Sequence, residues 1–81
     1  MYTQSIDDPF DTGFYTYDIA RTAGTFPEGM TGYGTLINIE GTSSNFAMQI
    51  LRSNMHIHTN KTIYGRFKTN GVWGNWTILI S

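Results

Sequence analysis

The sequence predicts a mainly β protein: a small antiparallel sheet or sandwich of about five to six short strands. Three observations lead to this fold class. Thr, Asn, Ser and Gly make up 32 of the 81 residues, a mixture that suits pleated surfaces and tight turns and disfavours helices. Few windows keep apolar residues at helical spacing, because glycines interrupt most of them. Finally, Asn70-Gly71 is a dipeptide that two-residue type I′ hairpin turns prefer.

Turn residues separate runs of alternating apolar and polar residues, and each run predicts one strand. The first run places Tyr15, Tyr17 and Ile19 on one face. A long loop follows over residues 20–34, where four glycines break any period, and a short helical turn over residues 18–22 is an option. The predicted strands cover residues 14–19, 36–40, 46–52, 55–58, 63–69 and 73–80.

Residues 1–9 show no period, and Asp7-Asp8-Pro9 is typical of a turn, so we expect a linker to an upstream segment with solvated acidic side chains. Residues 10–81 then form one small domain. Five basic and six acidic residues leave a net charge of −1, which argues against a nucleic-acid surface because phosphate binding needs clustered Lys and Arg. There is no Cys for disulfides, and no apolar run is long enough for membrane insertion.

The register of the C-terminal hairpin predicts which side chains share a face. With Asn70-Gly71 at the centre of the turn, the apolar face, which we expect to be the core side, holds Ile63, Gly65, Phe67, Gly74, Trp76 and Ile78. The opposite face holds Tyr64, Arg66, Lys68, Trp73 and Asn75. A bulge at Gly74 is the alternative, because it shifts the register by one residue and exchanges the faces. The predicted core of the whole chain is Tyr15, Ile37, Ile39, Phe67, Trp76 and Ile78.

An ordered set of short motifs runs along nearly the whole chain: Gly13-x-Tyr15, Pro27, Gly34-x-Leu36, Gln49, Tyr64-x-Arg66 and Trp73-x-x-Trp76. This succession resembles the pyocin-knob domain, which occurs in tail fibres of bacteriophages and of phage-derived bacteriocins. The resemblance implies a small β-rich knob, usually homotrimeric, that helps the particle attach to a bacterial surface. It also implies a place on the virion tail fibre or on a phage-derived tail-like particle, where the chain works outside the cell.

Tyr64, Arg66 and Trp73 are the candidates for contact with a receptor or with a neighbouring chain. They lie opposite the expected core face, where a flat ring such as Trp73 can stack on a sugar. Together with the attachment role that the resemblance implies, this makes bacterial surface polysaccharide, or another surface receptor, the expected partner. Arg66 also admits a structural role, as a cation–π brace across neighbouring rings. Gln49 is expected to satisfy a buried backbone group.

The aromatic residues are too many for one small core, which predicts an interface with another chain; with the resemblance to the pyocin-knob domain, we expect a homotrimer in the full fibre. Phe14 lies on the opposite face of its strand from Tyr15 and Tyr17, and Trp73 and Tyr64 lie opposite the expected core face. Exposed apolar area of this kind usually marks an interface, and a three-fold fibre buries it in closed symmetry. We expect the isolated chain to associate only weakly. The alternative is a purely structural trimerisation or spacing module, with receptor binding elsewhere in the fibre.

Catalysis and metal binding find little support. His56 and His58 share one face of a strand and are weak metal candidates, because no third ligand accompanies them. Asp18 and Glu40 lie on or beside predicted strands, but nothing places them across a common cleft. No nucleophile motif is present. We therefore expect a non-catalytic protein without a cofactor.

Overall fold

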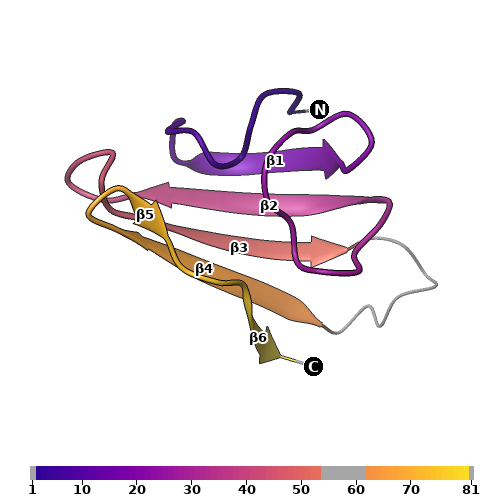
Figure 1. Cartoon of the computed structure of the whole chain (residues 1–81). Coiled ribbons are helices and arrows are strands. Elements are labelled where there is room, and N and C mark those ends of the chain that lie inside the picture. The colour runs from indigo at the N-terminus through magenta and orange to yellow at the C-terminus, as the bar shows by residue number, and fades with distance from the viewer. Residues whose placement is uncertain (1, 54–61, 81) are drawn as a thin grey trace.

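The computed structural model describes residues 2–53 and 62–80, whose six strands form one antiparallel sheet (Figure 1). The strands are β1 Gly13–Asp18, β2 Tyr33–Glu40, β3 Ala47–Ser53, β4 Ile63–Thr69, β5 Val72–Trp73 and β6 Thr77–Ile80. No described residue is helical, and none belongs to a helix that could cross a membrane. The predicted mainly β fold is thus confirmed. The strand predicted over residues 55–58 lies outside the described residues.

Strands β1 to β4 are neighbours in chain order, and both β5 and β6 pair with β4. The long loop expected after the first strand connects β1 to β2. It begins with a single turn, in which the Arg21 and Thr22 N–H groups donate to the Asp18 carbonyl at 2.8 and 2.6 Å. This turn does not continue into a helix.

The hairpin turn forms where the sequence predicts it. Asn70 and Gly71 both adopt positive φ, 52° and 81°, as a type I′ turn requires. Lys68 pairs with Trp73 in the predicted register. Local turn chemistry therefore predicts this hairpin correctly, and a hydrogen bond from the Gly71 N–H to the Asn45 carbonyl at 3.1 Å ties the turn to the loop between β2 and β3.

Beyond Gly74 the predicted register is wrong. Gly65 pairs with Thr77 instead of Trp76, because the chain leaves the ladder between Gly74 and Trp76 before it returns as β6. The irregular alternative, with a shift of one residue, is the one observed. Leu79 rather than an indole ring covers Gly65: a methyl group built there would lie 2.7 Å from the Leu79 Cδ1 atom.

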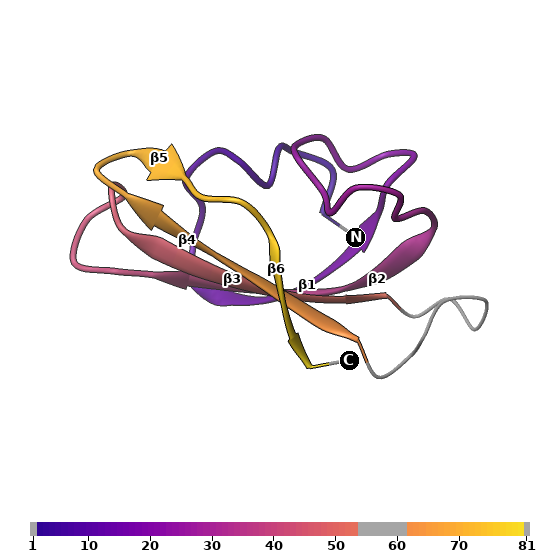
Figure 2. The same ribbon diagram turned by 60° about the horizontal axis from the view of Figure 1, so that its bottom comes forward.

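One face of the sheet is covered by two irregular segments, residues 2–12 and 19–32, which lie on the same side in Figure 2. We call this the covered face. Its core consists of Ile6, Tyr17, Leu36 and Leu51, each at most 1% exposed. Since Ile6 is fully buried and the Tyr2 N–H donates to the Thr16 carbonyl at 2.8 Å, residues 2–9 belong to the domain. The expected linker over residues 1–9 is corrected accordingly.

The opposite, open face has no covering segment among the described residues (Figure 2). Side chains that stand opposite each other in the ladder share a face, and Gly65 and Phe67 identify the open side of β4. The apolar side chains of this face are Phe14, Ile37, Ile39, Met48, Ile50, Ile63 and Phe67, with Leu79 over Gly65. None of them is fully buried.

The predicted core is therefore wrong for four of its six members. Ile39, Phe67 and Ile78 are 37%, 59% and 59% exposed. Ile37 is half-buried, on the open face. The physical reason is that the covering segments pack on the side of the sheet that carries Leu36 and Leu51. In the sequence, that side has fewer apolar residues than the opposite side. Of the predicted core residues, Tyr15 and Trp76 do pack against the buried cluster.

Candidate functional site: a tryptophan-lined groove

A groove of about 560 Å³ lies on the covered side, between the loop that follows β1 and the segment that joins β5 to β6. We call it the Trp groove. Its lining residues are Asp7, Thr25, Phe26, Pro27, Glu28, Arg66, Trp73, Gly74, Asn75 and Trp76. The irregular segment after β5 makes the groove possible: the Gly74 N–H still donates to the Phe67 carbonyl of β4 at 2.8 Å, and the chain leaves the β4 ladder at residues 75–76.

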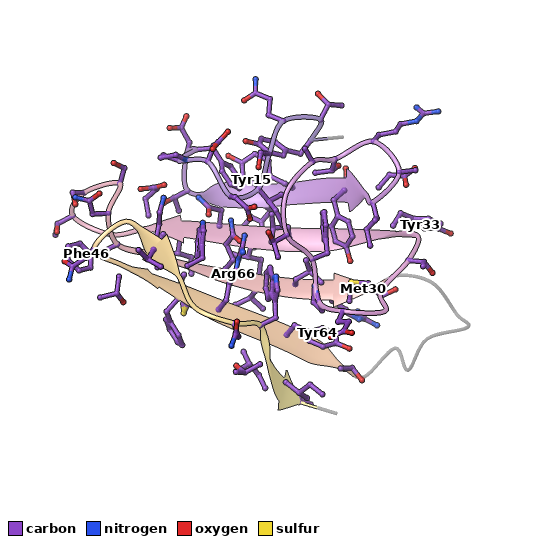
Figure 3. All side chains as sticks on the ribbon, in the orientation of Figure 1. Tyr15, Met30, Tyr33, Phe46, Tyr64 and Arg66 are labelled. Carbon is purple, nitrogen blue, oxygen red and sulfur yellow. The ribbon has the colours of Figure 1, made fainter. Side chains whose placement is uncertain are left out.

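Arg66 forms the floor of this groove. Strand alternation places it on the covered face of β4, where it is only 2% exposed (Figure 3). The guanidinium carbon lies 4.1 Å from the Trp73 ring centroid and 4.5 Å from that of Trp76. Such stacking stabilises both rings and the cation. Arg66 is thus a brace, as the structural interpretation of the sequence predicted, and it is not an exposed contact residue.

The same guanidinium joins three segments of the chain by hydrogen bonds. Arg66 Nε donates to Gln49 Oε1 at 2.8 Å, and Nη2 donates to Asp7 Oδ1 at 2.8 Å and to the Ile6 carbonyl at 3.3 Å. Gln49 Nε2 also donates to the Ile6 carbonyl, at 2.8 Å, which confirms the predicted role of this amide. Every buried side-chain polar atom of the described residues has a partner.

Asp7 is the charged partner of Arg66, so the prediction of a solvated linker side chain is wrong for this residue. Its carboxylate also accepts hydrogen bonds from the Thr25 N–H and hydroxyl groups, at 3.1 and 2.9 Å. Burial alone raises the pKa of Asp7, but the hydrogen bonds from Arg66 and Thr25 outweigh it and hold the pKa below its ordinary value of 3.8. Burial lowers the pKa of Arg66, and Asp7 opposes that change. Asp7 is therefore ionised at neutral pH.

Both indole rings are fixed by their N–H groups. Trp73 Nε1 donates to the Asp7 carbonyl at 2.9 Å, and Trp76 Nε1 donates to the Thr25 carbonyl at 2.8 Å. Each ring is half-buried, so part of it remains at the groove surface. Trp73, a predicted contact residue, lies at the groove, and so does Trp76, which was expected only in the core.

Tyr64, the third predicted contact residue, lies elsewhere. It is half-buried on the covered face, packs against the core and does not line the groove. Burial raises the pKa of its neighbour Tyr17, and Tyr64 adds to that change. His56 and His58 lie outside the described residues. Within residues 2–53 and 62–80, no three His, Asp or Glu side chains gather as a metal site would require.

Comparisons with protein-family models, with curated proteins and with solved structures find no match to this chain. What the groove can do is therefore argued from its own geometry. It offers two rigid aromatic walls, the carboxylates of Asp7 and Glu28, and the amide of Asn75. Rings and hydrogen-bonding groups of this kind suit the binding of a polar ligand with an apolar face.

Proposed function

We propose that this chain is a non-catalytic knob domain of a phage-type tail fibre, which takes part in attachment to the bacterial cell surface through a surface glycan. The observation that supports it best is the Trp groove. Sugars present hydroxyl groups at their edges and C–H groups on their faces, so they match a site that combines acceptors with aromatic rings. Trp73 and Trp76, which belong to the motifs that resemble the pyocin-knob domain, are also the indole rings of this groove.

A glycan array and an adsorption assay on whole bacteria test the proposal. The labelled chain is expected to bind at least one bacterial surface polysaccharide, and to lose adsorption when cells lack that polysaccharide. The informative variants are Asn75→Ala and Glu28→Ala, because both side chains line the groove and both residues are exposed, so neither change disturbs the core. Each is expected to weaken binding.

The matched control is Tyr33→Ala. Tyr33 is 54% exposed and lies at the far end of the sheet from Arg66 (Figure 3), so its removal is expected to leave glycan binding unchanged. Absence of binding to every polysaccharide and every strain, with the chain folded, would contradict the proposal. Equal losses in Tyr33→Ala and the groove variants would show that binding does not involve this groove.

A second candidate function, a structural module that holds fibre chains together as a homotrimer, is supported by the open face. Ile50 lies at the centre of this face and is flanked in the ladder by Ile37 and Gly65, so apolar surface extends across four strands. Strand spacing and rise give the face an area of roughly 300–400 Å². A standard interface needs about 800 Å² from each partner, so this face alone supports only weak association.

Light scattering distinguishes the second candidate from the first. Attached to a trimeric shaft, which raises the local concentration of the three chains, the knobs are expected to associate through the open face. The isolated chain is expected to associate weakly. If the knobs remain independent on a trimeric shaft, the structural function is wrong, and glycan binding in the groove is unaffected by that result.

A further inference from the structure

We infer that the Trp groove selects neutral or amino-bearing sugar residues and discriminates against acidic ones, an inference that rests on the proposed glycan-binding function. Glu28 lines the groove, and no Arg or Lys among the lining residues pairs with its carboxylate. The single cation of the lining, Arg66, is already paired with Asp7 at 2.8 Å. The lining therefore carries one more negative than positive charge.

An anionic sugar would find no accessible cation among the lining residues, because Lys68, whose Nζ lies 5.4 Å from the Trp73 ring centroid, is only 7% exposed and does not line the groove. Arg66 is only 2% exposed, lies between two rings and donates to Gln49, Ile6 and Asp7. A carboxylate, phosphate or sulfate group would instead approach Glu28, which is exposed to solvent. Repulsion between unit charges about 4–6 Å apart in water corresponds to a discrimination of about three- to fivefold.

Neutral sugars have suitable partners in the same place. The carboxylates of Asp7 and Glu28 accept hydrogen bonds from hydroxyl groups, and the side chain of Asn75 both donates and accepts. An ammonium group of an amino sugar gains from the same excess of negative charge. The negative faces of the indole rings attract the C–H groups of a sugar ring.

The rings are already fixed before a ligand arrives. Trp73 and Trp76 are each held by one N–H hydrogen bond and by the guanidinium of Arg66. Binding therefore costs little side-chain entropy. The groove volume of about 560 Å³ falls within the range of small-ligand sites and has room for one or two sugar rings. For a single hexose we expect a dissociation constant on the order of 1 mM.

Intrinsic fluorescence measures this binding directly, because the chain has two Trp and both line the groove. The probes are methyl glucoside, glucosamine and glucuronic acid, added to the full chain at low ionic strength. We expect a saturable change with the first two probes and about three- to fivefold weaker binding of glucuronic acid. Glu28→Gln is expected to remove most of this difference. Glu40→Gln, the same change outside the groove, is expected to preserve it.

The inference is overturned if glucuronic acid binds as tightly as methyl glucoside, or if none of the sugars changes the fluorescence. Either result remains distinct from a failure of the proposed function, which is measured by adsorption to cells. A chain that adsorbs to cells while its fluorescence ignores all three sugars binds its glycan elsewhere. If the fluorescence responds to sugars but the chain adsorbs to no cell, the charge selectivity stands and the proposed role in attachment is wrong.

Discussion

The two faces of the sheet distribute polarity in opposite ways. On the covered face, Asn38, Gln49 and Arg66 are at most 2% exposed. On the open face, Phe14 and Phe67 are 80% and 59% exposed. Polar side chains are thus buried and large apolar ones are left in contact with solvent, which reverses the usual expectation for a half-covered antiparallel sheet.

The difference arises from what covers the sheet. Residues 2–12 and 19–32 are irregular segments, whose backbone groups have few ladder partners of their own. Polar side chains of the sheet supply those partners: carbonyl groups in the cover accept hydrogen bonds from Asn38, Gln49, Arg66, Trp73 and Trp76. Irregular covering segments therefore require polar side chains on the sheet face that they cover. A second sheet, whose backbone groups pair with one another, would have required an apolar face instead.

The largest effect on stability is expected for Arg66→Ala, which removes a buried polar side chain of the covered face. The change leaves the buried amide of Gln49 and the one-third exposed carboxylate of Asp7 without their partner, and the cost approaches the range of about 3–5 kcal/mol that applies to a fully buried pair. A domain of 81 residues has a total stability of roughly 4–12 kcal/mol, so the variant is expected to be close to unfolding. Urea denaturation measures the loss of unfolding free energy.

Arg21→Ala is the control for the loss of charge, because Arg21 is exposed in the loop after β1. Its expected effect is within about 0.5 kcal/mol. If Arg66→Ala costs less than about 1 kcal/mol, the hydrogen-bond network does not hold the cover on the sheet. The covered face would then depend on its apolar core alone.

A smaller loss is expected for Asn38→Ala. The Asn38 amide donates to the Phe10 carbonyl at 2.8 Å, and its oxygen accepts from Gln49 at 3.1 Å. Removing it leaves buried polar groups unsatisfied, at a cost of about 1–3 kcal/mol. Thermal unfolding compared with Asn75→Ala, an exposed amide, is the measurement. Equal melting temperatures for the two variants would contradict the role assigned to Asn38.

The strands were predictable from sequence because their signals are local. Asn70-Gly71 adopts the turn that its sequence prefers, and β4 appears at its predicted residues. The choice of face is not local. Ile37 and Ile39 make their side of β2 look like the interior, yet the interior side is that of Leu36, since the cover packs there.

The site was predictable only in part, for a related reason. Trp73, Trp76 and Arg66 lie close together in sequence, and strand pairing brings their side chains together as a cation–π brace. Asp7 is 59 residues from Arg66, and Thr25 is 51 residues from Trp76. No periodicity relates positions so far apart. The local signs that this segment packs are its apolar residues Tyr2, Ile6 and Phe10.

The pH dependence of the unfolding free energy tests how Asp7, in the covering segment of residues 2–12, stabilises the covered face. The pKa of Asp7 in the folded chain lies below its ordinary value of 3.8, so Asp7 stabilises the fold above that value and loses this contribution as the pH falls through its folded pKa. The Asp7 side chain is 34% exposed, so solvent screening makes the effect modest. Urea midpoints between about pH 5 and pH 2 measure it.

Asp7→Asn separates this contribution from that of the other carboxylates. The stability difference between the original chain and Asp7→Asn is expected to shrink as the pH falls. Asp8→Asn removes the adjacent exposed carboxylate and is expected to show the same change of stability with pH as the original chain. A constant difference between the original chain and Asp7→Asn across the acid range would show that the ion pair with Arg66 does not stabilise the cover.

The smallest effect on folding is expected on the open face. Phe67→Thr keeps a residue that suits strands and removes a ring that is 59% exposed, so the unfolding free energy should change by no more than about 0.5 kcal/mol. Its expected effect is on association: at high concentration, or on a trimeric shaft, the variant should be more monomeric than the original chain. Sedimentation measures both chains.

Ile78→Thr is the matched control, because Ile78 is equally exposed but pairs with Tyr64 instead of lying on the open face. Loss of association in Phe67→Thr alone would assign the contact to the open face. Equal loss in both variants would point to general hydrophobic adhesion. Unfolding of Phe67→Thr would reverse the comparison itself, since it would mean that the open face contributes to the fold of the single chain as the covered face does.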